Sequence, residues 1–465
     1  MNYKVEDKKL SELTDGTNIT YGVVKPGDNP ERGIRFIRGG DISERKINLS
    51  ELRNITKEVS EEYSRTLLKG GELIISLVGN PGEVAIVPKK LKGANIARQV
   101  GLIRSNEDVI DKYYLMYYLT SPLGKAKLKA NSRGSVQQVI NLRELKNIEI
   151  PVYNLEVQKE IANQLKTIDQ KIHLNRQTNE TLEAMAKAIF KSWFVDFDPV
   201  RAKMEAKSAG RDPNRAAMAV ITGISLDQGW DEVEFALDQK LSSMTEEQRQ
   251  QLIRTAQLFP DELVESEIGE VPKGWETNRI DELGEIVTGK TPPTKNPENY
   301  GDDVPFLTIP DMHGNIYAIE TSKYLSKKGA DTQKNKYLPA GSVSMSCIAS
   351  PGLVVLNHRE CHTNQQINTL IPDEIEYSIF YFFLLIELSD EVIMKGSGGS
   401  VFKNMNKGQF SSLKVRMPEK KLRGFYNQQV KPLMDKILQN ELESQSLSHL
   451  RDTLLPRLIS GEIQI

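Results

Sequence analysis

The sequence repeats itself, and this internal repeat constrains the fold more than any single motif does. Four stretches of the first half recur in the second half at an offset of 265 to 270 residues. The matched pairs are 34–42 with 304–312, 68–82 with 338–352, 97–103 with 364–370, and 134–141 with 399–406. The framework of the two copies is the same, whereas polar residues between the matched positions differ. We therefore expect one domain of about 150 residues that is present twice.

Each copy has the pattern of a strand-rich domain. Short apolar runs, such as 73–75 and 84–87, alternate with turns that contain proline, glycine or asparagine, which is typical of strands. The apolar stretches 111–121 and 377–388 each predict one helix within this pattern. The sequence therefore predicts a mixed α/β (α+β) fold.

A long helix is predicted at the end of each copy. The stretch 156–194 lacks proline and glycine, and its apolar and amide residues alternate at spacings of four and three, which is a heptad seam. Adding 265 to these positions gives a second seam with its polar interruption in the same place. The expected helix-pairing residues are Ile161, Leu165, Ile168, Ile172, Asn175, Leu182 and Ile189 in the first seam and Val430, Leu433, Ile437, Asn440, Leu447 and Leu454 in the second.

The matching asparagines Asn175 and Asn440 favour pairing of the two helices with each other, because one buried asparagine fixes the register of a coiled coil. The alternative is that each stripe packs only on its own domain. Arg451 interrupts the second seam, and we expect Leu450 to fill the core there. Pro432 predicts a kink or a late start of the second helix.

The predicted elements follow the order domain, helix, domain, helix. This order is that of a two-fold dimer whose two subunits are joined into one chain. We expect two domains related by a pseudo-twofold axis and joined by two long coiled-coil helices; if these helices pair antiparallel, each domain lies at an opposite end of a shared rod. A helix of 39 residues is about 58 Å long, and successive faces of B-DNA recur every ~34 Å. Two similar frames with different loops would suit a DNA target in two unlike halves. The same geometry would also suit a coiled-coil scaffold that binds two protein partners.

The expected boundaries are 1–155 and 271–420 for the domains, 156–197 and 421–465 for the helices, and 198–270 for a central linker that binds a partner.

The composition limits the classes of function. Lys and Arg number 61 against 63 Asp and Glu, which gives a net charge of −2, so any surface that binds a polyanion must be local. The start of the chain lacks an apolar signal region, and no run of about 18 apolar residues occurs, so we expect a cytoplasmic protein without a membrane partner. Cys347, His358, Cys361 and His362 lack the paired spacing of structural zinc sites, and we expect no metal.

The segment 284–291, GEIVTGKT, satisfies the P-loop pattern and would make the chain a nucleotide hydrolase. A P-loop needs a helix N-terminus to hold phosphate. Pro292, Pro293 and Pro297 follow directly and oppose that helix. The first copy keeps the turn but loses the Lys-Thr pair, so we place Lys290 on a recognition loop near DNA phosphate instead.

Several stretches resemble the specificity subunit of type I restriction-modification enzymes, and the resemblance covers nearly the whole chain. These stretches are AMAKAIFKSWFVDFDPVRAKMEAK (184–207), LFPDELVESEIGEVPKGWE (258–276), GKTPPTKNPENYG (289–301), CHTNQQINTLIP (361–372) and LLPRLISGEI (454–463). Residues 198–270, with the helical stretch 244–259, are similar to the central region of that family, which contacts the methyltransferase.

The resemblance implies two target-recognition domains that each read one half of a bipartite double-stranded DNA site, with the two antiparallel helices setting the spacer. It also implies two methyltransferase subunits, which use S-adenosylmethionine, and two restriction subunits, which use ATP and Mg²⁺. The chain itself would then carry no cofactor and no catalysis. In agreement, no N-P-P-[YF] or D-P-P-[YF] signature of amino-methyltransferases and no compact nuclease cluster occurs in the sequence.

We expect the DNA contacts in loops between the strands, because the loops vary while the frame repeats. Arginine suits guanine edges, glutamine suits adenine, and lysine suits phosphate. The alternative for each residue is an ordinary loop residue that bonds its own backbone. The candidates are Arg98, Gln99, Lys125, Lys127, Lys129, Arg133, Ser135, Gln137 and Gln138 in the first domain and Lys290, Asn364, Gln365, Gln366, Ser400, Lys403 and Asn404 in the second.

Overall fold

The computed structural model describes residues 5–130, 139–396, 404–460 and 462–463. The chain divides into two compact units. Unit 1 comprises residues 1–175 and 443–465, and unit 2 comprises residues 176–442. Each unit therefore contains one globular part and one end of each long helix.

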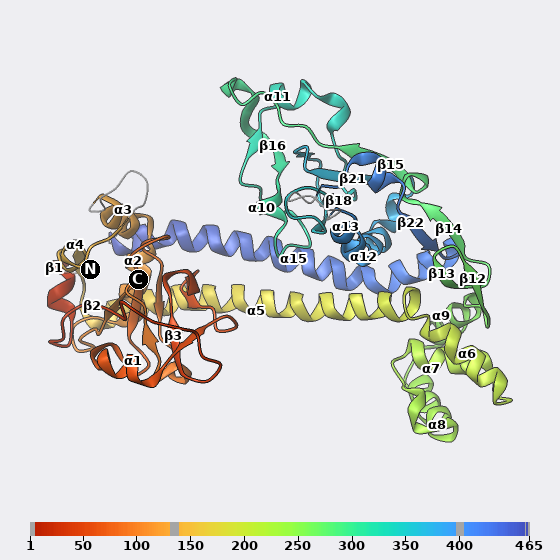
Figure 1. Ribbon diagram of the computed structural model, residues 1–465, viewed down its shortest axis with the longest axis horizontal. Coiled ribbons are helices and arrows are strands. Elements are labelled where there is room, and N and C mark those ends of the chain that lie inside the picture. Colours follow the sequence, from red (N-terminus) through yellow and green to blue (C-terminus); the bar gives the residue numbers. More distant parts are fainter. Residues whose placement is uncertain (1–4, 131–138, 397–403, 461, 464–465) are drawn as a thin grey trace. The chain divides into compact units, whose positions relative to one another are not determined.

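Unit 1 has a four-stranded sheet with the order β2-β10-β7-β8 and a second sheet with the order β6-β3-β9. Strands β2 and β3, one from each sheet, are labelled in Figure 1. Side chains alternate between the two faces of β7. Leu73 and Ile75 pack with helix α2 in one core, and Ile74 packs in the core on the opposite face. The strands are β1 (Glu6–Lys9), β2 (Thr20–Tyr21), β3 (Ile34–Ile37), β4 (Ile42–Ser43), β5 (Lys46–Ile47), β6 (Arg53–Ile55), β7 (Leu73–Ser76), β8 (Val84–Ile86), β9 (Asn95–Ile96), β10 (Val100–Ile103) and β11 (Glu149–Val152). The helices are α1 (Lys57–Glu62), α2 (Lys112–Thr120), α3 (Pro122–Ala130) and α4 (Leu142–Lys146).

Unit 2 repeats both main sheets of unit 1 and the pair β1-β11, which corresponds to β14-β22, but its described residues contain no strands that match β4 and β5. Its four-stranded sheet has the order β15-β21-β18-β19, and its second sheet has the order β17-β16-β20. In both units the second sheet contains one parallel pair, β3 with β9 and β16 with β20. The strands are β14 (Glu276–Arg279), β15 (Gly284–Thr288), β16 (Tyr300–Leu307), β17 (Tyr324–Leu325), β18 (Val343–Ser346), β19 (Val354–Leu356), β20 (His362–Thr363), β21 (Ile367–Pro372) and β22 (Lys414–Met417). The helices are α10 (Ile309–Met312), α11 (Lys327–Asp331), α12 (Ser378–Glu387), α13 (Ser389–Gly396) and α14 (Lys407–Ser411). The predicted mixed α/β fold is confirmed, and α2 and α12 are the two helices predicted inside the copies.

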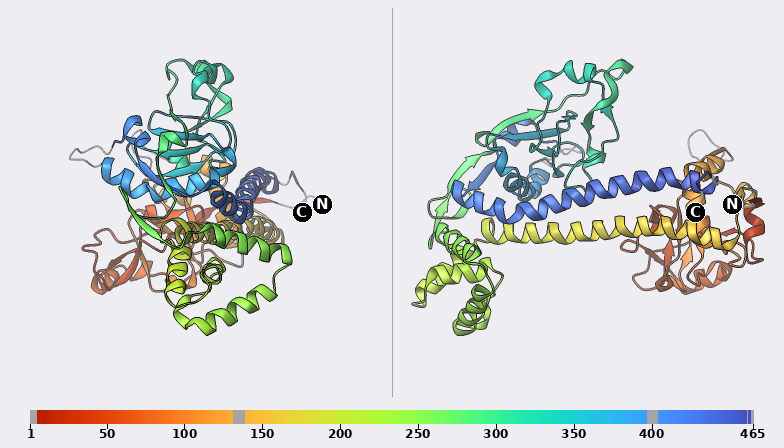
Figure 2. Two further views of the ribbon diagram at one scale, coloured as in Figure 1. Left: turned by 90° about the vertical axis from the view of Figure 1, so that its right-hand side faces the viewer. Right: turned by 180° about the vertical axis from the view of Figure 1, so that it is seen from behind.

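The long helices α5 (Leu155–Phe194) and α15 (Lys420–Ile459) each have 40 residues and run antiparallel. In unit 1, Asp169 of α5 contacts Arg451 of α15, and Lys171, further along α5, contacts Glu443. In unit 2, Tyr426 donates a hydrogen bond to the carbonyl of Ala186. Residue numbers rise along one helix as they fall along the other, and Figure 2 shows the two helices side by side. The predicted antiparallel pairing is confirmed.

The two seam asparagines are buried and make equivalent contacts across the helix pair. Asn175 Nδ2 donates to Glu443 Oε2 at 2.8 Å and to Ser444 Oγ at 3.2 Å. Asn440 Nδ2 donates to Asn179 Oδ1 at 2.8 Å. Adding 265 converts positions 175 and 179 into 440 and 444, so the same interhelical contact occurs once in each unit. Since a buried amide loses these bonds when the register slips, the asparagines specify the pairing.

The structure corrects two expectations for α15. Leu450 is 47% exposed, whereas the Arg451 side chain is 12% exposed and lies in the seam. The expectation that Leu450 fills the core was wrong, because Asp169 of α5 neutralises the buried guanidinium. A late start at Pro432 was also wrong, since the helix runs from Lys420 through this residue.

The heptad positions are buried to different extents. The predicted pairing residues Ile161, Leu165, Ile172, Val430 and Ile437 are buried. Ile168, Leu182, Ile189, Leu433, Leu447 and Leu454 are only partly buried. Phe190, which follows Ile189, is 1% exposed, and Met434, which follows Leu433, is 0% exposed. The buried face is wider than a heptad seam here, because both helices also pack against a globular part.

Four helices and a hairpin follow α5 within unit 2. They are α6 (Asp198–Ser208), α7 (Pro213–Ile221), α8 (Trp230–Ser242), α9 (Glu246–Leu258), β12 (Leu263–Ser266) and β13 (Gly269–Pro272). Thr245 and Gln248 form a capping box that starts α9 inside the predicted stretch 244–259. Among the described residues, no helix combines the length and the apolar character needed to cross a membrane.

A strained turn in unit 2 provides a first prediction. Ala349 has φ +66°, and the equivalent residue of unit 1, Gly79, has φ +87°. Alanine pays a steric penalty in this left-handed region and glycine does not. Ala349→Gly should therefore stabilise unit 2 by about 1 kcal/mol, measured by thermal unfolding.

The matched control is Gly79→Ala, which should destabilise unit 1 by a similar amount. A Cβ at Gly79 would meet no atom within 4 Å, so this variant changes only the backbone preference. A lower melting temperature for Ala349→Gly would contradict the strain.

Candidate nucleic-acid interface

Four loop segments that are distant in sequence meet at one place in unit 1. The backbone N–H of Arg98, after β9, donates to the carbonyl of Val23, after β2, at 2.8 Å. The N–H of Leu77, after β7, donates to the carbonyl of Gln99 at 2.7 Å, and the N–H of Ile140 donates to the carbonyl of Leu77 at 3.0 Å. This loop cluster exposes the side chains of Arg98 and Gln99.

Unit 2 builds the equivalent loop cluster. The N–H of Lys290 donates to the carbonyl of Thr363 at 3.0 Å, and that of Cys347 donates to the carbonyl of Gln366 at 2.8 Å. The N–H of Met405 donates to the carbonyl of Cys347 at 2.9 Å. Lys290 and Gln365 are exposed on this cluster. The structure thus brings together two candidates that the sequence places 75 residues apart.

Two residues of the second cluster shape the loop that presents Gln365. Asn364 is 9% exposed; its Nδ2 donates to Gln366 Oε1 at 3.0 Å, and its Oδ1 accepts the Gln366 N–H at 3.0 Å. This bonding gives Asn364 a structural role in the turn. Thr291 Oγ1 donates to Gln365 Oε1 at 2.7 Å and so orients the exposed amide. The sequence analysis missed Thr291, although it directly follows Lys290.

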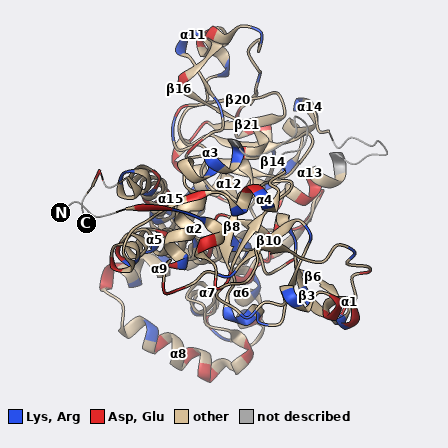
Figure 3. Cartoon of the chain, turned by 90° about the vertical axis from the view of Figure 1, so that its left-hand side faces the viewer, with Lys and Arg blue, Asp and Glu red and all other residues tan. Residues whose placement is uncertain are grey.

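The other candidates lie in different surroundings. Lysines colour α3 blue in Figure 3. Lys125 pairs with Glu83 at 2.8 Å, and Lys127 donates to the carbonyl of Glu149 at 2.9 Å, so both already have partners within unit 1. Lys129 is exposed, and Asn404 is exposed beside Ile348, with which it forms a β-bridge. Arg133, Ser135, Gln137, Gln138, Ser400 and Lys403 lie outside the described residues.

The structure agrees with the rejection of a P-loop at 284–291. Gly284 begins strand β15. Between β15 and α10, where every residue is described, the helical structure is limited to a three-residue 3₁₀ turn at Pro297–Asn299. The N–H groups of Gly289 and Lys290 donate to protein carbonyls and do not point toward a phosphate site. A Cβ at Gly289 would lie 2.3 Å from the carbonyl oxygen of Asn364, and one at Gly22 would lie 1.8 Å from that of Ile96. Glycine is shared by the copies because two loops cross there.

Cys347, Cys361 and His362 are packed in the core, whereas His358 is partly exposed. Burial raises the pKa of Cys347 to about 11 and that of Cys361 to about 12, and it lowers the pKa of His362 to about 4. In the part of the chain that the structure describes, no group of three or more His, Cys, Asp or Glu is arranged to hold a metal ion. Buried thiols in the neutral form pack as small apolar groups.

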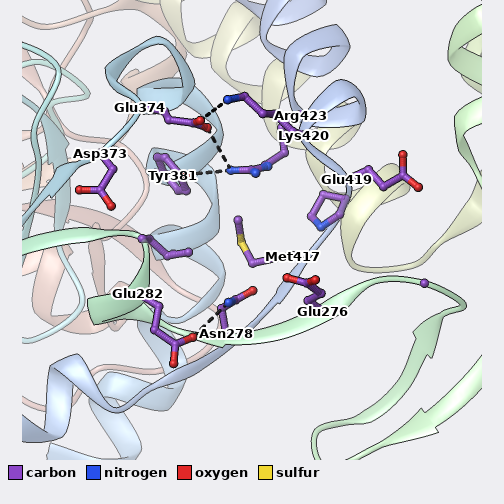
Figure 4. Close-up of a pocket in the computed structure, with 13 residues that line it drawn as sticks. Glu276, Asn278, Glu282, Asp373, Glu374, Tyr381, Met417, Glu419, Lys420 and Arg423 are labelled. Atoms are coloured by element: carbon purple, nitrogen blue, oxygen red, sulfur yellow. Dashed lines mark hydrogen bonds and ion pairs between the residues drawn. The ribbon is translucent and has the colours of Figure 1, made fainter.

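A hollow of about 400 Å³ in unit 2 is acidic (Figure 4). Lys420 and Arg423 both pair with Glu374, and Arg423 Nη1 also donates to the Tyr381 hydroxyl at 2.8 Å. The remaining charged residues of the lining are Glu276, Glu282, Asp373 and Glu419. This excess of carboxylates disfavours a phosphate backbone. The loop cluster is therefore the better candidate for DNA.

Comparison with known proteins gives a consistent family. A model of the type I restriction modification DNA specificity domain matches residues 5–184 and 272–450. The type I restriction enzyme HindI specificity subunit of Haemophilus influenzae is 36% identical over 444 residues, which cover 94% of this chain and 95% of that protein. The EcoBI specificity subunit of Escherichia coli is 32% identical over 203 residues, which cover 40% and 43% of the two chains.

A solved structure is also similar to this chain. The S subunit of a type I restriction-modification system from M. genitalium aligns with a TM-score of 0.51 at 16% identity, and the alignment covers 98% of this chain and 96% of that chain. At this identity the likeness concerns the fold alone.

Proposed function

The chain belongs to the family of type I restriction-modification DNA specificity subunits, and from this premise we propose that each unit reads one half of a bipartite DNA target. The observation that carries the proposal is the repeated loop cluster. The backbone bonds from Leu77 to Gln99 and from Ile140 to Leu77 recur in unit 2 from Cys347 to Gln366 and from Met405 to Cys347, but Arg98 and Gln99 occupy one cluster where Gln365 and Gln366 occupy the other. Identical frames with different exposed side chains suit two different half-sites.

The exposed residues suit direct reading of bases. Arg98 has the paired donors that recognise guanine, and Gln99 and Gln365 have the amide that recognises adenine. Lys290 is placed to contact phosphate, which would contribute affinity without sequence preference. The helices α5 and α15, which pass through both units, would set the spacer between the half-sites.

The catalytic steps would belong to partner subunits. We propose that the chain is non-catalytic and directs two methyltransferase subunits, which bind S-adenosylmethionine, to the target. Two restriction subunits, which require ATP and Mg²⁺, would join the same complex in the cytoplasm. Residues 198–270, which form α6 to α9, β12 and part of β13, are the region that we propose contacts the methyltransferase, because they resemble the central region of the family. Family membership decides against the alternative of a coiled-coil scaffold.

Methylome sequencing of a host with and without this gene would define the target. In a band-shift assay of the chain with its methyltransferase subunits, Gln365→Ala should weaken binding to that target by roughly 10-fold, the loss expected for one base contact. The control is Gln439→Ala, an exposed residue of α15, which should bind like the wild type. Equal binding by both variants would refute the assignment of Gln365, and a methylome without a two-part motif would refute the bipartite target.

A further inference from the structure

One carboxylate in unit 1 collects donors from three separate elements. Asp169 of α5 accepts hydrogen bonds from Arg45 Nε at 3.1 Å and Nη2 at 3.3 Å. It also accepts one from Arg451 Nη1 of α15 at 2.8 Å and one from the Tyr117 hydroxyl of α2 at 2.8 Å. The Arg45 guanidinium lies 5.7 Å from the centre of the Tyr117 ring. We call Asp169, Arg45, Arg451 and Tyr117 the Asp169 clasp.

The hairpin that supplies Arg45 has a strained tip. The two residues between β4 and β5, Glu44 and Arg45, have φ +48° and +62°. Such turns normally use asparagine or glycine, and residues with a Cβ persist there only where the surroundings hold them. The next residue, Lys46, contacts His173 Nδ1 through Nζ at 3.0 Å, one turn further along α5. The hairpin tip is therefore fixed to α5 at two points.

The charges of the clasp are largely removed from water. The exposed fractions of the side chains are 16% for Arg45, 12% for Arg451 and 25% for Asp169. Burial opposes ionisation of Asp169, but Arg45, Arg451 and the Tyr117 hydroxyl together hold its pKa below the usual range. Removing the carboxylate would leave the shielded Arg45 without this acid and beside Arg451, which keeps its pair with the more exposed Asp452 at 2.8 Å.

Unit 2 fills the same positions with apolar residues. An offset of 265 places Met434 where Asp169 stands and Ala186 where Arg451 stands. Helix α12 begins 266 residues after α2, which places Phe383 where Tyr117 stands. All three belong to one buried core. The loop that matches the hairpin also docks there, because the Tyr317 hydroxyl donates to the Met434 carbonyl at 3.4 Å. The fold therefore needs a docking point at this place but does not need charges.

A short path connects the clasp to the reading loop of unit 1. Residues 39–41, directly before β4, lie against the loop cluster, since a Cβ at Gly39 would be 3.5 Å from Gln99 Cβ. The N–H of Asn48, directly after β5, donates to the carbonyl of Asp41 at 2.8 Å. A shift of the hairpin on α5 would be transmitted to Gln99 through residues 39–45.

We infer that Asp169 is a positioning residue for DNA recognition: it clamps the globular part of unit 1 to the helix pair and so fixes where the loops of unit 1 stand along the target. The inference rests on the proposed function, in which the helices set the spacer between two half-sites. Its specific consequence is that loss of the clasp relaxes the choice of spacer length without changing the bases that each half-site requires.

The experiment compares Asp169→Asn, Asp169→Glu and wild type, each expressed with the methyltransferase subunit in a host whose methylome is sequenced. The readout is the methylated fraction of genomic sites with the wild-type spacer and with spacers one base pair longer or shorter. Asp169→Asn should raise the ratio of altered-spacer to wild-type-spacer methylation at least 5-fold. Asp169→Glu keeps the charge and should restore a ratio close to that of the wild type. Asp435→Asn is the control. Asp435 is half exposed and pairs with Lys431 of its own helix.

Three results would overturn the inference. They are an unchanged ratio in Asp169→Asn, an equal loss of methylation at every spacer, and relaxation by Asp169→Glu as large as that by Asp169→Asn. If the wild type in the same experiment methylates only sites with its own spacer length, these results refute the positioning role and leave the proposed function intact. A wild type that methylates all spacers equally would refute the bipartite target itself, and the positioning role with it.

Discussion

Replacing Phe190 with alanine should lower the free energy of unfolding of unit 2 by about 3–5 kcal/mol. Phe190 is 1% exposed and lies where α5, α12 and α15 meet. Its ring centre lies 5.1 Å from that of Phe194, 5.5 Å from Phe380, 5.9 Å from Phe383 and 5.6 Å from Tyr426. Deleting the ring removes contacts with all of these neighbours and leaves a cavity that rigid helices close poorly.

The measurement is denaturant unfolding of the full chain, followed by the fluorescence of Trp193, Trp230 and Trp275, which all lie in unit 2. Met185→Ala is the matched control, because Met185 lies on the same helix and is 49% exposed. The control should change stability by less than about 0.5 kcal/mol. Similar losses for the two variants would show that the aromatic cluster is not the centre of the core.

Replacing Glu441 with glutamine should stabilise unit 2, and the gain should grow with pH. Glu441 of α15 faces Glu183 of α5, and one of its oxygens, Oε2, is buried without a hydrogen-bond partner within the described residues. Burial, and to a smaller extent the charge of Glu183, together raise the pKa of Glu441 to about 8. Burial also raises the pKa of Glu183. Two carboxyl groups in one seam cannot both ionise without cost.

The direction of the pH dependence follows from these shifts. An unfolded glutamate ionises near pH 4.3, whereas folded Glu441 keeps its proton up to about pH 8. The stabilising contribution of the protonated carboxyl is therefore complete below about pH 4.3 and is lost as the pH rises to about 8. Glutamine is neutral at every pH, so the advantage of the variant should be smallest below about pH 4.3 and should grow as the pH rises, reaching about 1–3 kcal/mol near pH 8.

Melting temperatures of both proteins between pH 5 and pH 9 would test this expectation. Glu247→Gln on the exposed face of α9 controls for the general effect of removing one negative charge. Parallel melting profiles for Glu441→Gln and wild type would contradict a protonated Glu441.

The sequence alone determined the repeat, the fold class and the helix pair. Periodicity is a local property, and the matching seams with Asn175 and Asn440 indicated that the two helices pair, whereas their antiparallel direction came from the family resemblance. Local chemistry also ruled against a P-loop at 284–291, because Pro292 and Pro293 exclude a helix after Lys290. The residues that carry the family resemblance are likewise readable in order along the chain.

Only the tertiary structure decided which side chains meet. Periodicity gives a face of a helix but not its partner, so Arg451 was expected outside the core until Asp169 appeared opposite it. Composition marked Asn364 and Gln365 as equal candidates, yet backbone bonds bury the first and expose the second. The Asp169 clasp joins positions 45, 117, 169 and 451, and the loop cluster of unit 2 joins 290, 347, 365 and 405. Contacts over such separations depend on how the whole chain packs, and no local pattern in the sequence encodes them.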